Sequence, residues 1–105
     1  MKTEKFKISF FTDALEYSQK EVSGERIKIE GIECFIFIDP EETPQGTVEG
    51  FNISHLETGY RVAQDLSRIG AIVKAEKNIS RGWERAYSFA LKQCKELGIQ
   101  LPVNI

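Results

Sequence analysis

The chain has one histidine and two cysteines among its 105 residues, and these three residues form no cluster in the sequence. There is no Cys-x-x-Cys pair, so the spacing excludes the common structural zinc sites, and we expect neither a metal nor a cofactor. Cys34 lies in an apolar run and Cys94 on the apolar stripe of the last predicted helix. We expect two buried free thiols, with a Cys34–Cys94 disulfide as the alternative if the helix packs over that strand.

Long apolar runs and an excess of one charge sign are also missing. The longest apolar run, Cys34 to Ile38, is far shorter than the roughly 18 residues that a membrane helix needs. The N-terminus mixes both charge signs and has no signal-peptide pattern. With 14 basic and 16 acidic residues, the net charge of −2 gives no overall attraction to nucleic acid or to an anionic membrane. We expect a cytoplasmic protein without membrane contact, folded as a single domain over residues 1–105.

Strand patterns fill the first part of the chain. Residues 5–11 alternate polar and apolar side chains, which predicts a half-buried strand, whereas residues 12–23 fit either a short helix or a strand extension. Residues 25–39 predict a hairpin that turns at Glu30-Gly31, where glycine can adopt the positive φ of a type I′ turn. The return strand, Ile32 to Ile38, is apolar on both faces and is therefore typical of a central strand.

The next segments are a loop, a second hairpin and an ambiguous stretch. Residues 39–50 carry two prolines, two glycines and four acids, which predicts a loop. Residues 51–63 predict a hairpin with its turn at 56–59, where Gly59 is the residue most suited to left-handed geometry. Residues 65–77 fit either a short helix interrupted by Gly70 or an edge strand.

The clearest element is a C-terminal helix over residues 81–97. Apolar residues recur there at three- and four-residue spacings, Ser80 is a good N-cap, and Gly98 ends the pattern. Its spacing predicts that Trp83 is the main core anchor. Because every apolar face must be buried, we expect an α+β fold: a mainly antiparallel sheet of four or five strands packed against one long C-terminal helix.

His55 is the natural candidate for catalysis, but no partner accompanies it. No GxSxG, HExxH or phosphate-loop motif is present, and a general base needs a positioned nucleophile and an orienting group. We therefore expect no enzyme and no catalytic residue. The predicted role of His55 is structural: a ring half-packed on the core that hydrogen-bonds the backbone of the turn.

The motif G-I-E-C-F at residues 31–35 is followed by Ser54, His55, Thr58, Gly59, Val62 and Ala63 in the pattern S-H-x-x-T-G-x-x-V-A, and then by an amphipathic helix. This arrangement, over residues 25–97, resembles short uncharacterised proteins from phages and mobile elements of Gram-positive bacteria. The segment 64–78 is longer than that resemblance leads one to expect. The resemblance implies a small accessory protein and transfers no catalytic residue.

Strand alternation predicts which residues share a face. We expect the helix to be faced by Phe6, Ile8, Phe10, Ile27, Ile29, Cys34 and Ile36. The opposite face then carries five basic residues and two aromatic rings, which are Lys5, Lys7, Arg26, Lys28, Phe35, Phe37 and Arg61. Our leading interpretation is a non-enzymatic accessory protein that acts through contact with a protein partner or through self-association.

The alternative function is single-stranded nucleic-acid binding on this basic and aromatic face, where cations follow the phosphates and bases stack on rings. Against that alternative, Phe35 and Phe37 could be covered by residues 12–24 or by a dimer partner.

Overall fold

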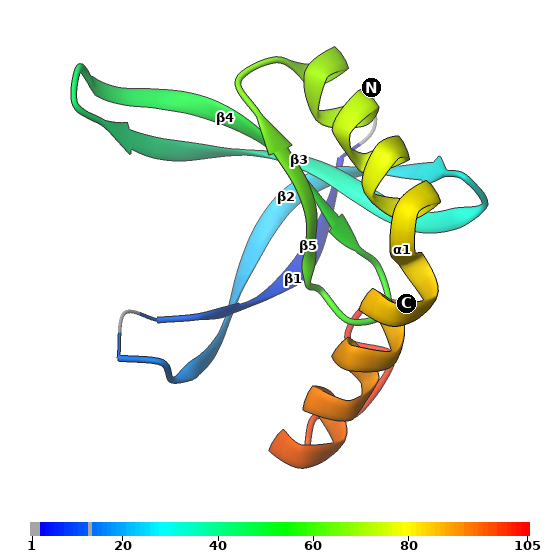
Figure 1. Ribbon diagram of the computed structural model, residues 1–105. Coiled ribbons are helices and arrows are strands. Elements are labelled where there is room, and N and C mark those ends of the chain that lie inside the picture. The colour runs from blue at the N-terminus through cyan, green and yellow to red at the C-terminus, as the bar shows by residue number, and fades with distance from the viewer. Residues whose placement is uncertain (1–2, 13) are drawn as a thin grey trace.

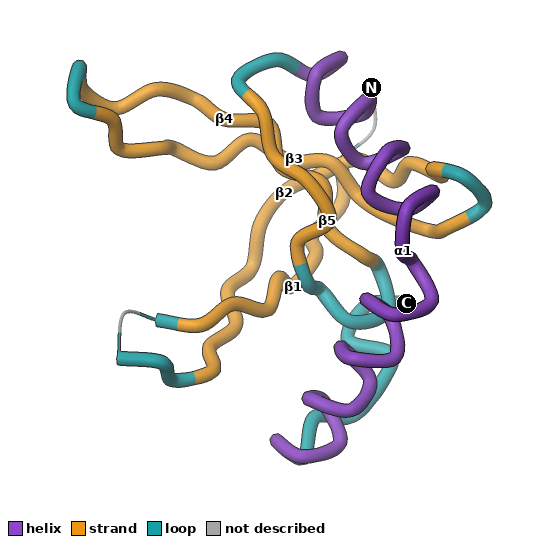
Figure 2. Tube along the Cα trace, in the orientation of Figure 1, coloured by secondary structure: helices purple, strands orange, loops and turns teal. Residues whose placement is uncertain are grey.

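The computed structural model describes the backbone of residues 3–12 and 14–105, and in these ranges all side chains except those of residues 41–43 and 48. This part of the chain forms five strands and one helix: β1 (Glu4–Phe11), β2 (Tyr17–Ile29), β3 (Ile32–Thr43), β4 (Gly46–His55), β5 (Arg61–Asp65) and α1 (Arg68–Leu97). The strands pair antiparallel in sequence order (Figures 1 and 2). One antiparallel sheet packed against one long C-terminal helix confirms the predicted α+β fold.

The tight turns follow the prediction. Glu30 and Gly31 have φ of 50° and 81°, as a type I′ hairpin requires, and Gly59 has φ of 75° in the β4–β5 turn. Residues 12–23, for which the sequence fits either a helix or a strand, belong largely to β2, which pairs with β1 from Tyr17 to Gly24. The predicted loop at 39–50 is wrong, because β3 and β4 continue through it as a ribbon that pairs Pro40 with Glu49. Proline is tolerated there because this part of β3 has a neighbour on one side only.

The sheet splits into two hairpins at Gly24. Strand β2 pairs with β1 up to this residue and with β3 from this residue on. A Cβ at Gly24 would lie 2.8 Å from the Ile36 carbonyl oxygen, so only glycine permits this approach. Beyond the split, the β1–β2 and β3–β4 hairpins leave the centre in different directions (Figure 1). The side of the sheet between them, opposite α1, is termed the concave face.

The core has two parts, one on each side of the sheet. On the α1 side, strand residues such as Ile36 and Ile53 pack with the helix residues Ala71, Ala75 and Ile79. Burial of each large aliphatic side chain stabilises the fold by about 1.5–3 kcal/mol. Trp83 is half-buried at the edge of this cluster, so the prediction that it is the main core anchor is wrong.

The concave face has its own cluster, which consists of Phe6, Ile8, Phe35 and Phe37. The rings of Phe6 and Phe35 stack with centroids 4.4 Å apart. The prediction that Phe6, Ile8 and Phe10 face the helix is therefore wrong. The strand register explains the error. Phe6 pairs with Val22 and Phe35 pairs with Arg26, and Val22 and Arg26 are on the same face of β2 because they are four residues apart. Phe6 therefore shares a face with Phe35. A shift by one residue moves a whole strand to the other face.

Helix α1 begins earlier than the sequence pattern indicates. Ser67 is its N-cap, in extended conformation, and its hydroxyl accepts a hydrogen bond from the Gly70 N–H at 3.0 Å. The predicted Ser80 cap is wrong, since residues 68–77 form the first turns of the same helix. Gly82, with φ −175° and ψ 36°, kinks the helix, and Gly98 ends it in left-handed conformation as predicted.

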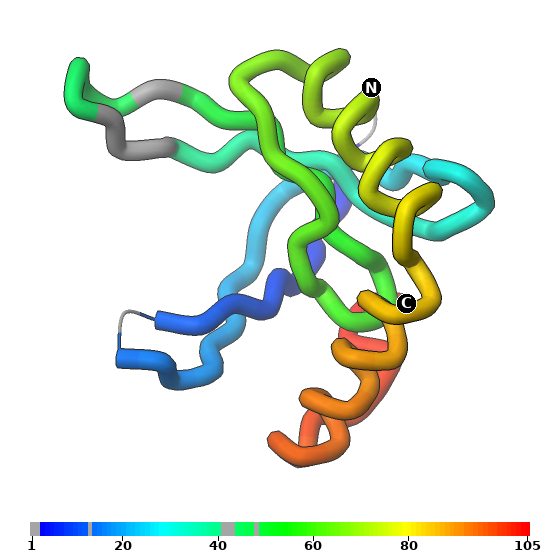
Figure 3. The backbone as a smooth tube through the Cα atoms, in the orientation of Figure 1, coloured from blue at the N-terminus to red at the C-terminus, as the bar shows by residue number. Residues whose placement is uncertain are grey.

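Both edges of the sheet are covered by other segments. Two side chains of α1 lie along the outer edge of β5, where Asn78 donates to the Val62 carbonyl at 2.8 Å and Lys74 to the Gln64 carbonyl at 3.4 Å. On β1, the C-terminal segment returns to the sheet (Figure 3). The Asn104 amide accepts from the Lys7 N–H at 2.7 Å and donates to the Lys7 carbonyl at 2.9 Å. Covered edges do not offer a template for uncontrolled strand pairing.

Candidate functional site

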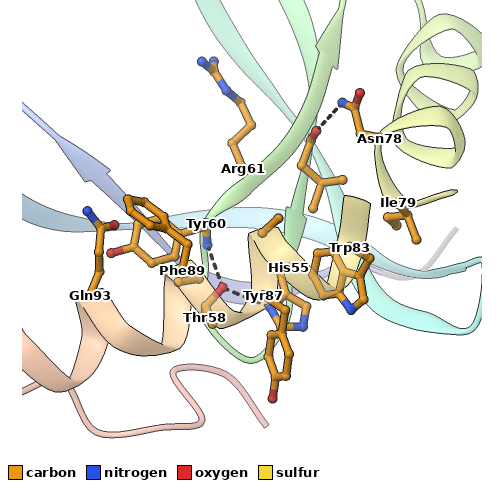
Figure 4. A pocket seen from close by; sticks show the side chains of 13 residues that line it. His55, Thr58, Tyr60, Arg61, Asn78, Ile79, Trp83, Tyr87, Phe89 and Gln93 are labelled. Carbon is orange, nitrogen blue, oxygen red and sulfur yellow. Dashed lines mark hydrogen bonds between the residues drawn. The ribbon is translucent and has the colours of Figure 1, made fainter. Parts of the chain in front are cut away.

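A hollow of about 350 Å³ lies between β5 and α1, on both sides of the Gly82 kink (Figure 4). Its wall is mainly apolar and aromatic, and it is termed the α1 groove. The residues that define it are Tyr60, Val62, Ile79, Trp83, Ala86 and Phe89, with His55 and Tyr87 at one end. Its volume is at the lower end of the range for sites that hold a small molecule, about 300–1,000 Å³.

His55 closes one end of this groove. It is 7% exposed, and its ring meets Trp83 and Tyr87 edge-on, with centroids 4.8 and 5.6 Å away. Its Nδ1 lies 3.0 Å from the Thr58 hydroxyl, which also accepts from the Tyr60 backbone N–H at 3.3 Å. That hydroxyl can therefore donate its own proton to Nδ1 of a neutral ring. The packed ring agrees with the prediction, but the bonding partner is a side chain and not the turn backbone.

The surroundings of this end favour the neutral form of His55. Burial lowers the pKa of His55, and the neighbouring Glu57 carboxylate opposes this shift only partly. The same carboxylate accepts a 2.6 Å hydrogen bond from the Tyr87 hydroxyl, which raises the pKa of Tyr87. Tyr87 in turn stacks on Trp83 at 5.6 Å. These contacts fix the aromatic wall in place before any ligand arrives.

Tyr60 lies between the α1 groove and a second hollow on the concave face, and it lines both. Its hydroxyl is buried without a hydrogen-bond partner in the described part of the chain. Burial raises the pKa of Tyr60 to about 12, and the nearby Cys94 thiol adds to this shift without being aligned for a good hydrogen bond. Burial also raises the pKa of Cys34 to about 12, so this free thiol stays protonated.

The rim of the groove carries an exposed aromatic ring. Phe89 is 61% exposed although it lines an apolar hollow. Its charged neighbours one turn away on the helix surface, at positions i−4 and i+3, are Arg85 and Lys92. The arrangement can therefore receive an apolar group while offering positive charge at the rim.

The predicted basic and aromatic face is not assembled as expected. Phe35 and Phe37 are 0% and 5% exposed, because residues of β1 cover them. The prediction that these two rings form an exposed stacking surface is therefore wrong. Lys5 and Lys7 pair with Ser23 and Glu21 and lie on the opposite side from Arg26 and Lys28.

Arg26, Lys28 and Arg61 lie on the same side of the sheet as Phe35, as expected, but two of them are paired with acids. Arg26 binds Glu4 at 3.0 Å, and Lys28 binds Glu33 at 3.2 Å. Arg61 lines both the hollow of the concave face and the α1 groove.

The sequence pattern missed Ala86 and Phe89 as groove residues. Apolar positions of the last helix cover an arc wider than the strip that the sheet can bury, and these two lie at its outer side. That width is the signal that could have identified them. Lys20, which lines the concave hollow, was missed because residues 12–23 had no assigned structure.

Within the described ranges, no group of three or more His, Cys, Asp or Glu side chains is placed to hold a metal ion. In the same part of the chain, the helix is not apolar enough over a sufficient length to cross a membrane. No protein-family model matches the chain, and neither a curated protein nor a solved structure matches it. The resemblance to phage and mobile-element proteins stays a prediction.

Proposed function

We propose that this protein is a small non-enzymatic binding module that holds a partner protein through the α1 groove. The observation that carries the proposal is Phe89, a large ring left 61% exposed beside an open apolar hollow. Aromatic side chains in and around a pocket are typical anchors of protein interfaces, whereas an exposed ring of this size stabilises a free monomer little.

The chemistry of the rim selects the kind of partner. Arg85 and Lys92 flank Phe89, and no ion pair of either residue is found in the described part of the chain. A partner segment with acidic residues beside an apolar anchor side chain complements this rim. The groove is large enough for one aromatic or large aliphatic side chain, which Trp83 and Val62 would contact from opposite walls.

The rigidity of the site also favours binding. Trp83 is held by stacking on Tyr87, and Tyr87 is held by Glu57. A wall that is already ordered loses little conformational entropy when a ligand arrives. The neutral His55 in this wall has its Nδ1 occupied by Thr58, which suits a packing role better than proton transfer.

Selection from a displayed library of random peptides tests this proposal. We expect the peptides enriched on the wild-type protein to share one large apolar residue next to acidic residues. Ala86→Glu places a carboxylate in the groove, and Ser88→Glu, on the far side of the helix, is the matched control. Enriched peptides should lose at least about tenfold in affinity for Ala86→Glu and keep it for Ser88→Glu.

Two results would contradict the proposal. One is a failure to enrich any peptide family, and the other is equal affinity of the enriched peptides for both variants. A second copy of the chain is a competing occupant of the groove. Sedimentation velocity of the free protein distinguishes it, because a dimer dispersed by Ala86→Glu and not by Ser88→Glu would replace a foreign partner with self-association.

A further inference from the structure

The concave face carries a second hollow, of about 550 Å³, which the proposed protein-binding role does not use. It is termed the concave cleft. Its apolar wall comes from Ile8, Phe10 and Phe11 of β1 and from Phe37 of β3. Its polar lining includes Asn52, Ser54 and Arg61. The volume falls within the range of pockets that hold small ligands.

Two polar side chains of the central strand β4 point into this cleft although they are almost fully buried. Asn52 is 4% exposed and Ser54 is 1% exposed. Asn52 donates one N–H to the Gly50 carbonyl at 3.3 Å. The rest of the Asn52 amide and the Ser54 hydroxyl belong to the lining of the cleft. A molecule in the cleft can therefore meet an amide and a hydroxyl group of β4.

A β-bulge brings a cation to the same place. Ile53 pairs with Ala63, but Ser54 pairs with Arg61, so Val62 is an extra residue in β5. Val62 and Ala63 both pack toward the α1 side, and Arg61 shares the concave face with Ser54. Bulges of this kind re-aim a side chain and occur often beside functional sites. Figure 4 shows Arg61 extending away from Trp83 and Tyr87.

The charges around the cleft favour an anion. Lys20 and Asp39, on the two hairpins, form an ion pair at 3.2 Å, so their opposite charges cancel. Arg61 has no ion pair in the described ranges. The guanidinium is therefore the uncompensated charge of the cleft, and its planar fork is suited to bidentate contact with phosphate.

The spacing of these groups defines the ligand. Asn52 and Ser54 lie two residues apart on β4, and Ser54 pairs with Arg61. The Asn52 position and the Ser54–Arg61 pair are therefore separated by about 7 Å along the strand. An asparagine amide presents a donor and an acceptor in one plane, which matches the edge of a nucleobase. We infer that the concave cleft binds a nucleoside monophosphate, with the phosphate on Arg61, the base edge on Asn52 and the base plane against Phe10.

Isothermal titration with the four common nucleoside 5′-monophosphates tests this inference, with the matching nucleosides and inorganic phosphate as separate arms. We expect at least one nucleotide to bind with a Kd below about 1 mM and at least about tenfold more tightly than its nucleoside or phosphate. Arg61→Gln and Ser54→Val should each weaken that nucleotide by about tenfold. Arg81→Gln, a charge change on the exposed surface of α1, should leave the affinity unchanged within about twofold.

Asn52→Leu separates base recognition from charge: it should weaken the nucleotide and leave phosphate binding unchanged, provided that its thermal unfolding remains cooperative. If Asn52→Leu does not fold, the Arg61→Gln arm still decides the inference. The inference is overturned if no nucleotide binds, if phosphate alone binds as well as a nucleotide, or if Arg61→Gln binds like wild type. Arg61 lines both hollows, whereas Asn52 and Ser54 line the concave cleft and not the α1 groove, so a loss of nucleotide affinity in Ser54→Val with unchanged peptide binding separates this inference from the proposed function.

Discussion

At the scale of single residues, His55 shows how burial decides a role. The only histidine of the chain is enclosed by Trp83 and Tyr87 and bonded to Thr58, so its environment favours the neutral ring. Motif spacing could predict that no catalytic partner accompanies it. The Trp83 and Tyr87 contacts could not be predicted, because they depend on how the kinked helix is placed over the β4–β5 turn.

The lowered pKa of His55 predicts a pH dependence of stability. The unfolded chain binds the proton first as the pH falls below the ordinary value of 6.5, because the folded-state pKa is lower. The stability contributed by the neutral ring is therefore complete above that pH and is lost as the pH falls through the folded-state pKa. Glu57 opposes the shift, and the Tyr87 hydroxyl stays neutral throughout this range.

Urea unfolding of wild type and His55→Gln between about pH 7 and about pH 5 measures this effect. We expect the free energy of unfolding to fall more steeply with acidification in wild type. Parallel curves for the two proteins would mean that His55 has the same pKa in the folded and unfolded states.

At the scale of elements, the two glycine turns predict different costs for the same substitution. Gly31 has φ of 81° with no atom within 4 Å of an added Cβ, whereas at Gly59 the Cβ would lie 2.9 Å from the Lys7 carbonyl oxygen. Gly31→Ala should lower the free energy of unfolding by about 1–2 kcal/mol, because it adds only the strain of a left-handed backbone. Gly59→Ala should lower the free energy of unfolding by about 1–3 kcal/mol more than Gly31→Ala, because the added Cβ also pushes the turn away from β1.

Denaturant melts of both variants check this difference. Equal losses of unfolding free energy would show that β1 does not pack against the β4–β5 turn. Gly31→Ala serves as the control, since it has the same chemistry and the same backbone strain without the crowding.

The C-terminal segment makes a second prediction at this scale. The Asn104 amide makes three hydrogen bonds, two with Lys7 and one with the Leu56 carbonyl at 2.9 Å. Asn104→Ala leaves these backbone groups without their partners and should lower the free energy of unfolding by about 2–3 kcal/mol. Gln100→Ala, at an exposed position of the same segment, should change it by less than about 0.5 kcal/mol. A thermal or urea melt of Asn104→Ala that matches the control would contradict this closure.

The elements also show what sequence patterns can and cannot supply. Alternation and turn chemistry were sufficient for β1, for the 25–39 hairpin and for the 51–63 hairpin, because these signals are local. The register of β1 on β2 is not local, and it placed Phe6 and Lys5 on unexpected faces. Prolines and glycines in 39–50 indicated a loop, but they are tolerated in a two-stranded ribbon that pairs with neither β2 nor β5.

At the scale of the whole molecule, the sheet has a hollow on each face, and Tyr60 lies between the two. The helix side offers an apolar groove with cations at its rim, and the concave side offers buried amide and hydroxyl groups with Arg61. The fold class followed from the sequence, since apolar faces had to be buried. Neither hollow could be predicted from the sequence. The α1 groove depends on the part of the helix surface that β5 leaves uncovered, and the concave cleft depends on the split of the sheet at Gly24 and on the β5 bulge next to Arg61.

We propose that the α1 groove receives an apolar side chain of a partner protein, and the only tryptophan of the chain, Trp83, lies in the wall of this groove. Titration of wild type with a library-selected peptide, followed by Trp83 fluorescence, is the most direct measurement. We expect a saturable shift in emission for wild type and Ser88→Glu at similar peptide concentrations, and a midpoint at least about tenfold higher for Ala86→Glu. A peptide that binds all three proteins equally, or binds without changing the Trp83 emission, would contradict it.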